Sequence, residues 1–563
     1  MMTIDVRAFA ASSILLLVAV TAVVQHVPIL VVHPNVQNPR VKIANGELEG
    51  HVKEGAHAFE GIPFAEKPGR LEYPVKKQNW KDVLEVKRQP PRCWQKLQYG
   101  GETSEDCLYL TVVAPSNKEQ KLPVVVVVHG GAFSGGGLFE TNVDHVAKHM
   151  VSKGVVVVAI QYRVGALGFC TTGDSVIPGN YGAYDVKMAL EWVRDNIGAF
   201  GGNPEDITTY GVSAGAAMVD ALLLNEETSK LFHKIIMVSG AARDLFKQDI
   251  KGSCKKFLES KGLDASTPQK MRESIITEGN ATKIETGFQD FFEDSISNFK
   301  LDWSPVIDGK LFKDNIKELR GKAPKKPMIV GLTDLEGAGF TTKFANPKDV
   351  LTWRENMRHI LEWMIPQIDD RYNVEQALLK EYDDFGNNRV NDTDDRNKAM
   401  ASKVAFDKAF GEYIMGSVVY DEVEYFLKKN GDDPKAPIYL FNFKRYNEAF
   451  TRNAVPFIDM RGAYHSMDQW YSINNDQRMK FADAADAYTR DLYTNIIVNF
   501  AKTGDPNGNG PTKLPVQWNK LTKEHPDRNY VIDDPAKVED DYFNGRLRRI
   551  RDWAIKWGRI TPM

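Results

Sequence analysis

Short runs of consecutive apolar residues recur along the chain, and most of them are rich in β-branched side chains. Continuous apolar runs of this length are typical of strands that are buried on both faces, as in a parallel sheet covered by helices on either side. We therefore expect each run to be a strand of one sheet. The runs are Val124–Val128, Val155–Ile160, Ile207–Tyr210, Ile235–Val238, Met328–Val330 and Ile438–Phe441.

Between the second and the third run, apolar residues recur at the spacing of an α-helix. Val186, Leu190, Val193 and Ile197 share one face of that helix. Gly198 and the glycines that follow are expected to end it. Strand, helix and strand in this order predict an α/β doubly wound fold, with a mostly parallel twisted sheet and helices on both faces.

Two long regions, about residues 245–325 and 345–430, are polar, helical in pattern and poor in strand-like runs. We expect them to be helical insertions above the sheet rather than separate domains. The chain shows no internal repeat of the length typical of solenoid proteins. Residues 35–563 are therefore predicted to form a single domain.

The first 24 residues are predicted to be a secretory signal peptide. Residues 8–24 carry no charge, Arg7 precedes them, and the small residues Ala19 and Ala22 provide a cleavage site. An uncleaved signal anchor is the alternative, because the apolar residues 27–32 extend the segment toward the length of a membrane-spanning helix. Contact with a membrane is expected only if this segment is retained.

Other features of the sequence fit the secretory pathway. Asn280-Ala281-Thr282 and Asn391-Asp392-Thr393 are sequons, so Asn280 and Asn391 are candidate glycosylation sites. The remainder of the chain has no other apolar stretch long enough to span a membrane. We expect a secreted protein or one that resides in the lumen of the secretory pathway.

Composition and charge narrow the class of protein further. Apolar residues make up 42% of the 563 residues and charged residues 26%, which excludes global disorder. Lysine and arginine number 72 and the acidic residues 75, a net charge of −3. This balance gives no attraction over the whole chain for nucleic acid or anionic lipid. No oligomeric state is predicted.

The four cysteines are too few for a disulfide scaffold, but they suffice for one or two bridges. Cys93 and Cys107 are 14 positions apart, and in an oxidising compartment we expect them to close a small loop. Cys170 and Cys254 have no local partner. They either pair with each other or remain buried thiols.

A candidate nucleophile lies in the sequence Gly211-Val212-Ser213-Ala214-Gly215, between a strand-like run and an apolar helical segment. A serine on a tight turn between a strand and a helix needs small residues two positions before and after it. The helix then directs its N–H groups and its positive end at the reaction centre. The alternative is a glycine-bounded turn in which Ser213 only caps the helix.

A candidate oxyanion hole follows the strand-like run Val124–Val128. His129-Gly130-Gly131-Ala132-Phe133 is a glycine-rich turn that exposes backbone N–H groups. The N–H groups of Gly130 and Gly131, with that of Ala214, are expected to bind the oxygen that becomes negative during acyl transfer. A phosphate-binding loop is disfavoured, because no Gly-Lys-Ser/Thr follows and the spacing does not match a dinucleotide turn.

A general base must be chosen among 11 histidines. His465 comes last in the order nucleophile, acid, histidine that α/β-hydrolases follow, although position alone does not single it out. His145 and His149 are one helical turn apart but lack the glutamate of a zinc-protease motif. We expect these two to be surface histidines, and no metal site is predicted.

Two carboxylates compete for the role of the acid that orients the base. Asp334 and Glu336 both follow the run Met328–Val330, where a loop after a late strand is expected to carry the acid. Gly337 and Gly339 form a turn that would direct Glu336 inward. The residues alone leave the choice open.

At these motifs the chain resembles the type B carboxylesterase and cholinesterase family of α/β-hydrolases. The resemblance extends over nearly everything after residue 40. It is carried by Phe59–Ala65, Ser104–Leu110, His129–Phe133, Tyr162–Phe169, Gly179–Gly182, Phe200–Pro204, Gly211–Ala216 and Asn499–Pro506.

The resemblance implies a role for each candidate. Ser213 is then the nucleophile, Glu336 the acid and His465 the base. It also implies a Cys93–Cys107 disulfide, an oxyanion hole from Gly130, Gly131 and Ala214, and structural ion pairs that involve Glu105, Arg163 and Asp185.

The chain departs from the family pattern at several positions. Val212 stands where a glutamate often precedes the serine, which removes a negative charge and favours neutral substrates. The family's second disulfide has no obvious pair, so the partner of Cys254 stays open. The loop from Cys93 to Cys107 lacks the tryptophan that binds choline in cholinesterases, and Trp94 is in the wrong place for it. A carboxylesterase is therefore favoured over a cholinesterase.

The sequence thus predicts a serine carboxylesterase that needs no metal or organic cofactor and acts through an acyl-enzyme on small to medium apolar esters. Two alternatives are an adhesion ectodomain in which catalysis is dispensable, and a lipase or hormone esterase with the same triad. In the C-terminal segment, Leu547, Ile550, Trp553 and Trp557 recur at helical spacing among four arginines. We expect this helix to pack its apolar stripe on the body and to leave its arginines in solvent.

Overall fold

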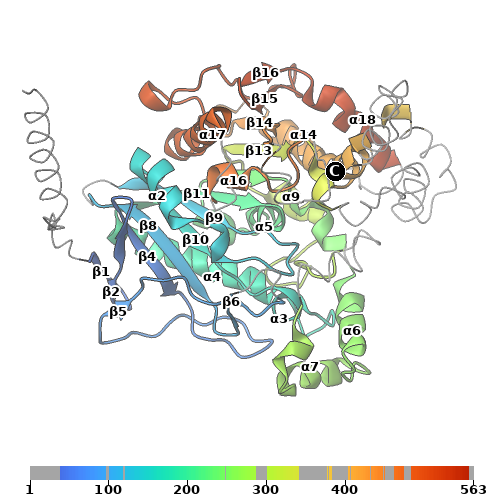
Figure 1. Ribbon diagram of the computed structural model, residues 1–563. Coiled ribbons are helices and arrows are strands. Elements are labelled where there is room, and N and C mark those ends of the chain that lie inside the picture. The colour runs from blue at the N-terminus through green and yellow to red at the C-terminus, as the bar shows by residue number, and fades with distance from the viewer. Residues whose placement is uncertain are drawn as a thin grey trace, which may run out of the picture. The chain divides into compact units, whose positions relative to one another are not determined.

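A computed structural model shows the fold (Figure 1). It describes residues 38–96, 101–117, 121–247, 249–286, 301–340, 377, 380–382, 404–405, 407–431, 433–447, 449, 462–474 and 483–556. The predicted signal segment, Asn391, Trp557 and most of the second predicted insertion lie outside these residues. Residues 39–563 belong to one compact unit. Within the described ranges, no helix combines the length and the apolar character that crossing a membrane requires.

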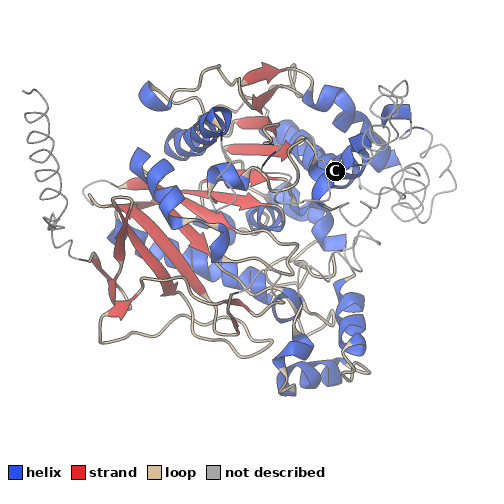
Figure 2. Ribbon diagram, in the orientation of Figure 1, coloured by secondary structure: helices blue, strands red, loops and turns tan. Residues whose placement is uncertain are grey.

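An eleven-stranded mixed sheet is the centre of this unit (Figure 2). Its strands lie in the order β16-β15-β14-β13-β12-β11-β9-β10-β8-β4-β3. Their bounds are β3 His51–Lys53, β4 Ala56–Pro63, β8 Tyr109–Pro115, β9 Leu122–Val128, β10 Val156–Ile160, β11 Gly202–Val212, β12 Lys234–Val238, β13 Met328–Thr333, β14 Ile438–Phe443, β15 Asn529–Ile532 and β16 Lys537–Glu539.

The six apolar runs of the sequence are the strands β9 to β14. Neighbours among them pair in parallel, and β15 continues the parallel set beside β14. The predicted strands and the predicted α/β fold are therefore confirmed. The antiparallel edges were not predicted: β3, β4 and β8 extend one side of the sheet, and β16 closes the other. Smaller sheets are formed by β1 Arg40–Ile43, β2 Gly46–Glu49 and β5 Leu84–Glu85, and by β6 Arg92–Cys93 with β7 Thr103–Ser104.

Apolar side chains pack on both faces of the large sheet. In β9, Val124, Val126 and Val128 belong to one buried cluster and Val125 and Val127 to another, because successive side chains of a strand point to opposite faces. The first cluster includes side chains of α4 (Tyr181–Asn196), α5 (Ala214–Leu223) and α14 (Ser417–Asn430). The second includes those of α2 (Val143–His149) and α17 (Ala484–Thr503). Helices thus cover both faces, which explains why the predicted runs within β9 to β14 are largely apolar.

Helix α4 confirms the helix predicted from periodicity. Val186, Leu190 and Val193 are buried on its inner face. A short 3-10 turn, Ile197–Phe200, follows, and the chain leaves it through Gly201 in the left-handed conformation (φ 84°). The glycines that the sequence places here therefore end the helix as expected.

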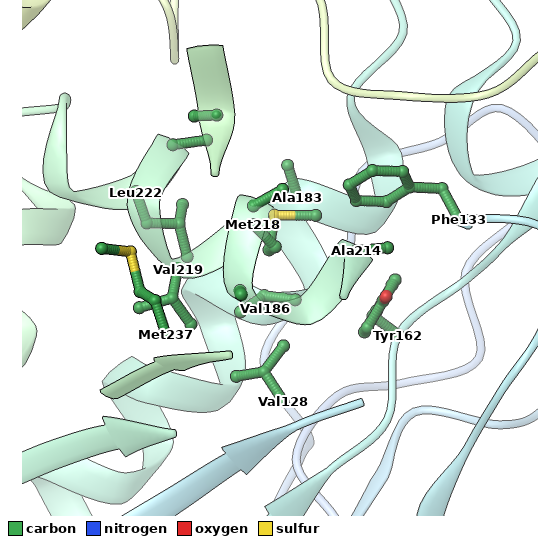
Figure 3. Close-up of a cluster of buried hydrophobic side chains, with 14 of the residues drawn as sticks. Val128, Phe133, Tyr162, Ala183, Val186, Ala214, Met218, Val219, Leu222 and Met237 are labelled. Carbon is green, nitrogen blue, oxygen red and sulfur yellow. The ribbon is translucent and has the colours of Figure 1, made fainter. Parts of the chain in front are cut away.

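Helix α5 differs from α4 because all of its residues are buried. Met218, Val219 and Leu222 lie among Val186 of α4 and Met237 of β12 (Figure 3). Asp220 is its one charged side chain, and a helix that is buried and otherwise apolar on all sides is typical of the centre of a core. Its N-terminus, directly after Ser213, is therefore fixed by packing on every side.

The first predicted insertion is helical, as expected. It contains α6 Ile250–Ser260, α7 Pro268–Thr277 and α9 Ile316–Lys322, and the side chains of Asp249, Thr267 and Asn315 cap their N-termini.

All four cysteines form disulfides. Cys93 pairs with Cys107, as predicted, with Cα atoms 4.9 Å apart. Cys170 pairs with Cys254, with Cα atoms 5.2 Å apart, although they are 84 positions apart in the sequence. This second bridge answers the question that the sequence left open and joins the end of α3 (Gly165–Phe169) to α6.

The C-terminal helix α18 (Arg546–Lys556) buries Leu547, Ile550 and Ala554 against the body, as expected. The expectation of solvated arginines holds for Arg548 and Arg549, whose side chains are 43% and 47% exposed, and was wrong for Arg546 and Arg551, which are 6% and 16% exposed. Each of the four arginines binds a carboxylate of another segment, because the helix lies over acidic side chains: Arg546 pairs with Glu412, Arg548 with Asp527, Arg549 with Glu381 and Arg551 with Asp421.

A fully buried ion cluster connects α5 with α9 and α14. Both Nη atoms of Arg320 bind Asp220, at 2.6 and 2.8 Å, and Nη2 also binds Glu422 at 2.8 Å. All three side chains have no exposed surface. Burial raises the pKa of Glu422 to about 8, against the opposing effect of the Arg320 charge. Arg320 therefore supplies the counter-charge of Asp220 and a hydrogen-bond donor to Glu422, without which these buried groups would be strongly destabilising.

We predict that Arg320→Met lowers the free energy of unfolding by about 3–5 kcal/mol, because the buried Asp220 carboxylate loses its counter-charge and Glu422 loses a hydrogen-bond donor. Lys230→Met is the matched control, since it breaks the exposed Lys230–Glu226 pair and should leave stability unchanged. Urea unfolding followed by fluorescence measures both. Equal effects of the two substitutions would contradict the prediction.

Candidate active site

Ser213 lies on the turn between β11 and α5 with a strained backbone (φ 57°, ψ −125°). A positive φ is uncommon for a residue other than glycine and persists only where neighbouring structure enforces it. Here the Ser213 N–H donates to the carbonyl of Val238 in β12 (2.8 Å), and its carbonyl accepts from Ala217 (3.1 Å). The turn is therefore held by the adjacent strand and by the first turn of the helix.

The two glycines of the motif are needed because of close backbone contacts. A Cβ atom at Gly211 would lie 2.5 Å from the carbonyl oxygen of Gly215. A Cβ atom at Gly215 would lie 2.1 Å from the carbonyl oxygen of Val128, at the end of β9. The structure thus shows why small residues are needed two positions before and after the serine.

The structure brings His465 to Ser213. The imidazole Nε2 lies 2.9 Å from Ser213 Oγ. On its other side, Nδ1 lies 2.7 Å from Oε2 of Glu336. Ser213, His465 and Glu336 therefore form one continuous chain of hydrogen bonds, with His465 9% and Glu336 2% exposed at the side chain.

The carboxylate oxygen of Glu336 that faces away from the histidine is also held in place. This oxygen, Oε1, accepts from the hydroxyl of Ser239 (2.5 Å) and from the backbone N–H of Thr333 (2.7 Å). Leu335, one residue before Glu336, donates its N–H to the carbonyl of Ala463, two residues before the histidine (2.8 Å). The loops that carry the acid and the histidine are therefore joined by backbone as well as by side chains.

Asp334, the alternative acid, lies elsewhere. Its carboxylate is 3.4 Å from Nζ of Lys408. The structure therefore places Glu336, not Asp334, against the imidazole.

The backbone of the glycine-rich turn indicates which N–H groups face the nucleophile. A Cβ atom at Gly130 would lie 3.0 Å from Cβ of Ser213, so this turn and the nucleophile turn are in contact. Gly131, Ala132 and Phe133 have successive positive φ angles of 105°, 52° and 57°. Consecutive N–H groups in such a turn form a concave site for an anion.

The N–H of Gly130 has a different neighbour. Burial raises the pKa of Glu140 to about 7, while the N–H groups of Gly137 and Gly130 and the charge of Arg92 act to lower it. The Gly130 N–H thus interacts with a carboxyl group behind the turn. This contact makes Ala132, which the sequence analysis did not name, a stronger candidate donor than Gly130.

A second buried carboxyl, Asp468, lies close to the hydrogen-bonded chain. Its Oδ2 accepts from the hydroxyls of Tyr493 (3.1 Å) and Tyr210 (3.4 Å), and it has no exposed surface. Burial and the charge of Glu336 raise the pKa of Asp468 to about 7, against lowering by Tyr493 and His465. Tyr210 belongs to the strand that leads to Ser213, so Asp468 connects the histidine loop with the nucleophile strand.

The expectation that His145 and His149 are surface residues was wrong. They are 3% and 9% exposed, and their ring centroids lie 4.8 Å apart. Burial lowers the pKa of His145 to about 3 and that of His149 to about 4. The helical spacing was right, but the face on which they lie packs toward α16 (Gln469–Ser472) and α17.

The residues expected to form structural ion pairs do so. Arg163 binds Asp185 at 2.7 Å, and both are buried. Glu105 pairs with Arg70 at 2.5 Å. Arg163 and Glu105 lie in segments that the sequence analysis matched to the family, and neither pair involves Ser213, His465 or Glu336.

Sequence reasoning missed Ser239, which donates to Glu336, and Asp468, which connects the histidine loop with the nucleophile strand. Ser239 follows β12, which lies between β11 and β13 in the sheet. The carboxyl ends of parallel neighbours share one edge, so a serine at this position is a signal that could have been used.

Comparisons with known proteins cover most of the chain. A family model described as the carboxylesterase family matches residues 37–549. Gut esterase 1 of Caenorhabditis briggsae is 29% identical over 498 residues, which are 83% of this chain and 85% of that protein. Bile salt-activated lipase of Bos taurus is 29% identical over 493 residues, 84% of this chain and 79% of the relative. Para-nitrobenzyl esterase of Bacillus subtilis is 27% identical over 532 residues, 88% of this chain and 95% of the relative.

The raised pKa of Asp468 predicts how stability changes with pH. The folded state holds this pKa at about 7, whereas an unfolded aspartate titrates near 4. Between about pH 4 and 7 the folded state therefore binds more protons, and the free energy of unfolding falls as the pH rises. Asp468→Asn does not titrate, so it should gain stability relative to the wild type across this window.

The measurement is urea unfolding of both proteins at pH 5, 6, 7 and 8. The expected change in their difference is at most about 1.4 kcal/mol per pH unit, levelling off above pH 7. A difference that does not vary with pH would show that Asp468 is ionised throughout.

Proposed function

This chain belongs to the carboxylesterase family and is a carboxylic ester hydrolase, and we propose that its reaction proceeds through an acyl-enzyme on Ser213. The observation that carries the proposal is the hydrogen-bonded chain from Ser213 Oγ through His465 to Glu336. A serine hydroxyl is a weak nucleophile at neutral pH, and an adjacent base that is itself oriented by a third group activates it.

In the proposed mechanism, Ser213 Oγ attacks the carbonyl carbon of the ester while His465 Nε2 takes its proton. The imidazolium then gives that proton to the leaving alcohol, and the acyl group remains on Ser213. A water molecule takes the place of the alcohol, loses a proton to the same nitrogen and attacks the acyl carbonyl. The carboxylic acid leaves, and the serine hydroxyl is restored.

Glu336 is proposed to orient the imidazole and to stabilise its cation. The hydrogen bond to Nδ1 keeps the proton on that nitrogen and leaves the Nε2 lone pair directed at Ser213 Oγ. The hydrogen bonds that Glu336 accepts from Ser239 and Thr333 support this role, because they fix the carboxylate before the reaction begins.

The oxyanion donors are proposed to be the N–H groups of Gly131, Ala132 and Ala214. Ala214 is the first residue of α5, so its N–H has no partner within the helix and lies at the positive helix end. Gly131 and Ala132 belong to the turn with positive φ angles. Gly130, which the sequence analysis included, is proposed to shape the turn instead, because its N–H interacts with Glu140.

Small to medium apolar esters are the proposed substrates. Val212, which precedes the nucleophile, is buried and uncharged. The ring of Phe340 packs on His465 at a centroid distance of 4.8 Å. Both side chains favour neutral, apolar groups over cations next to the reacting atoms.

The two alternative functions are less well supported. An adhesion ectodomain does not need the hydrogen bonds that join Ser213, His465 and Glu336. A lipase or hormone esterase would use the same chemistry, but the relatives named as esterases or carboxylesterases favour action on carboxylic esters in general.

A location in the secretory pathway or outside the cell is also proposed. Disulfides persist in oxidising compartments, and both pairs of cysteines are bonded. Asn280 is exposed, and its Oδ1 accepts a hydrogen bond from the Thr282 hydroxyl (2.6 Å), so this sequon is accessible to a glycosyltransferase. The predicted signal segment supports the same location.

We predict that Ser213→Ala lowers kcat/KM for p-nitrophenyl butyrate by about 10⁴-fold or more, because no other group can form the acyl-enzyme. The purified wild type and variant are assayed at pH 7.5, and their melting temperatures are compared to show that the variant is folded. A variant that retains a tenth of the wild-type rate would rule out the mechanism.

The choice between the two candidate acids gives a separate prediction. Glu336→Gln should reduce kcat by about 10²–10⁴-fold, because the imidazole loses the anion that sets its tautomer. Asp334→Asn is the matched control and should stay within a few-fold of the wild type, since its carboxylate faces Lys408. The reverse order of the two effects would reassign the acid.

A further inference from the structure

We propose that His129 is a positioning residue for the oxyanion turn, because its imidazole holds the carbonyl group of Gly130 and thereby aims the N–H of Gly131 at the reaction centre. The inference rests on the proposed function, and it assigns a task to a side chain that does not touch the substrate. His129 follows β9 directly and is 4% exposed.

The central contact is a hydrogen bond within the turn. Nδ1 of His129 lies 2.9 Å from the carbonyl oxygen of Gly130. A carbonyl oxygen only accepts, so Nδ1 carries the proton. Because a trans peptide is planar, the N–H of Gly131 points away from the carbonyl of Gly130. Holding that carbonyl on the imidazole therefore directs the Gly131 N–H to the opposite side.

The imidazole itself is held in place by a tyrosine. Its ring stacks on Tyr162 with centroids 4.2 Å apart and planes 8° apart. The Tyr162 hydroxyl donates to the backbone carbonyl of His129 (3.0 Å). Burial lowers the pKa of His129 to about 4, so the ring is neutral at the pH at which esters are hydrolysed by a histidine base. Both ring position and protonation state are thus fixed.

Gly136 lies against the hydrogen bond between His129 and Gly130. A Cβ atom at this position would lie 2.3 Å from Nδ1 of His129 and 2.6 Å from the carbonyl oxygen of Gly130, so only glycine allows the hydrogen bond between them. Gln95 binds both polar groups of Gly136: its Oε1 accepts from the N–H (2.9 Å), and its Nε2 donates to the carbonyl (2.8 Å). Gln95 is 4% exposed and follows Cys93 by two residues.

The turn needs such support because its conformation is costly. Positive φ angles at Ala132 and Phe133 cost free energy, and they persist only where the surrounding structure enforces them. Without the imidazole donor, the peptide between Gly130 and Gly131 is free to rotate. A rotated peptide would present a carbonyl oxygen, rather than an N–H, to the negative charge of the transition state.

The test compares two substitutions of the same residue. His129→Phe keeps an aromatic ring against Tyr162 but removes the donor, whereas His129→Asn keeps an N–H donor near the position of Nδ1. With p-nitrophenyl butyrate, we expect kcat of His129→Phe to fall by about 10²-fold with KM within threefold of the wild type, since the lost interaction acts mainly in the transition state. His129→Asn should recover most of that loss.

A trifluoromethyl ketone inhibitor supplies a readout that a merely structural role would not change. Its adduct with the serine places an oxyanion in the same site, so its Kd should rise by the same factor as kcat falls. His233→Phe is the matched control: Nδ1 of His233 accepts from the N–H of Ile207 (3.1 Å), at the opposite end of the parallel strands. That variant should lose thermal stability but keep kcat.

The outcomes separate this inference from the proposed function. If Ser213→Ala is inactive while His129→Phe matches His233→Phe in kcat and inhibitor affinity, the positioning role is overturned and the mechanism stands. If Ser213→Ala remains active, the proposed function itself fails. If His129→Phe does not fold, Gln95→Leu takes its place. We expect the same loss of kcat at unchanged KM. A Gln95→Leu variant that matches His233→Phe in kcat and inhibitor affinity would overturn the positioning role.

Discussion

The strained turn at Ser213 is the constraint on which the rest of the site depends. A backbone in this conformation is stable only where other segments leave it no alternative. The Val238 carbonyl accepts the N–H of Ser213, and a Cβ atom at Gly240 would lie 2.2 Å from the Ser213 carbonyl oxygen. On the opposite side, Gly215 lies against the end of β9. The parallel sheet thus determines where the hydroxyl lies before any catalytic partner is considered.

The partners of Ser213 are then positioned by the same edge of the sheet. Glu336 follows β13, the oxyanion turn follows β9, and Ser239 follows β12, so the carboxyl ends of neighbouring parallel strands supply most of the site. His465 is the exception, since it is brought in by a loop that pairs with Leu335. Asp468 lies three residues after the histidine, but its carboxyl group accepts from Tyr493 and Tyr210, and burial raises its pKa to about 7. Glu336 is therefore the carboxyl group that contacts the imidazole.

The sequence predicted those parts of the structure that depend on local pattern. Strands β9 to β14 are buried on both faces and contain largely apolar runs, whereas the antiparallel strands β4 and β8 mix apolar with polar residues and were not predicted. Spacing placed His145 and His149 on one helix face but contained no information about what packs on that face. The choice between Asp334 and Glu336 depends on contacts with residues more than 70 positions away, at Lys408 and Ala463. The Cys170–Cys254 bridge was open for the same reason.

The oxyanion turn shows how a site can be supported by parts that lie outside it. The N–H groups of Gly131 and Ala132 that we propose to bind the oxyanion belong to a strained segment, and nothing in the glycine-rich sequence itself stabilises that strain. Three successive contacts support the turn. His129 donates a hydrogen bond to the Gly130 carbonyl, and Gly136 leaves room for that hydrogen bond because it has no side chain. Gln95 in turn binds the backbone of Gly136. Because Gln95 lies two residues after Cys93, the disulfide to Cys107 restricts the segment that supports the turn. We therefore expect the bridge to contribute to the geometry of the site as well as to stability, because restricting Gln95 limits the movement of Gly136 and of the turn that Gly136 contacts.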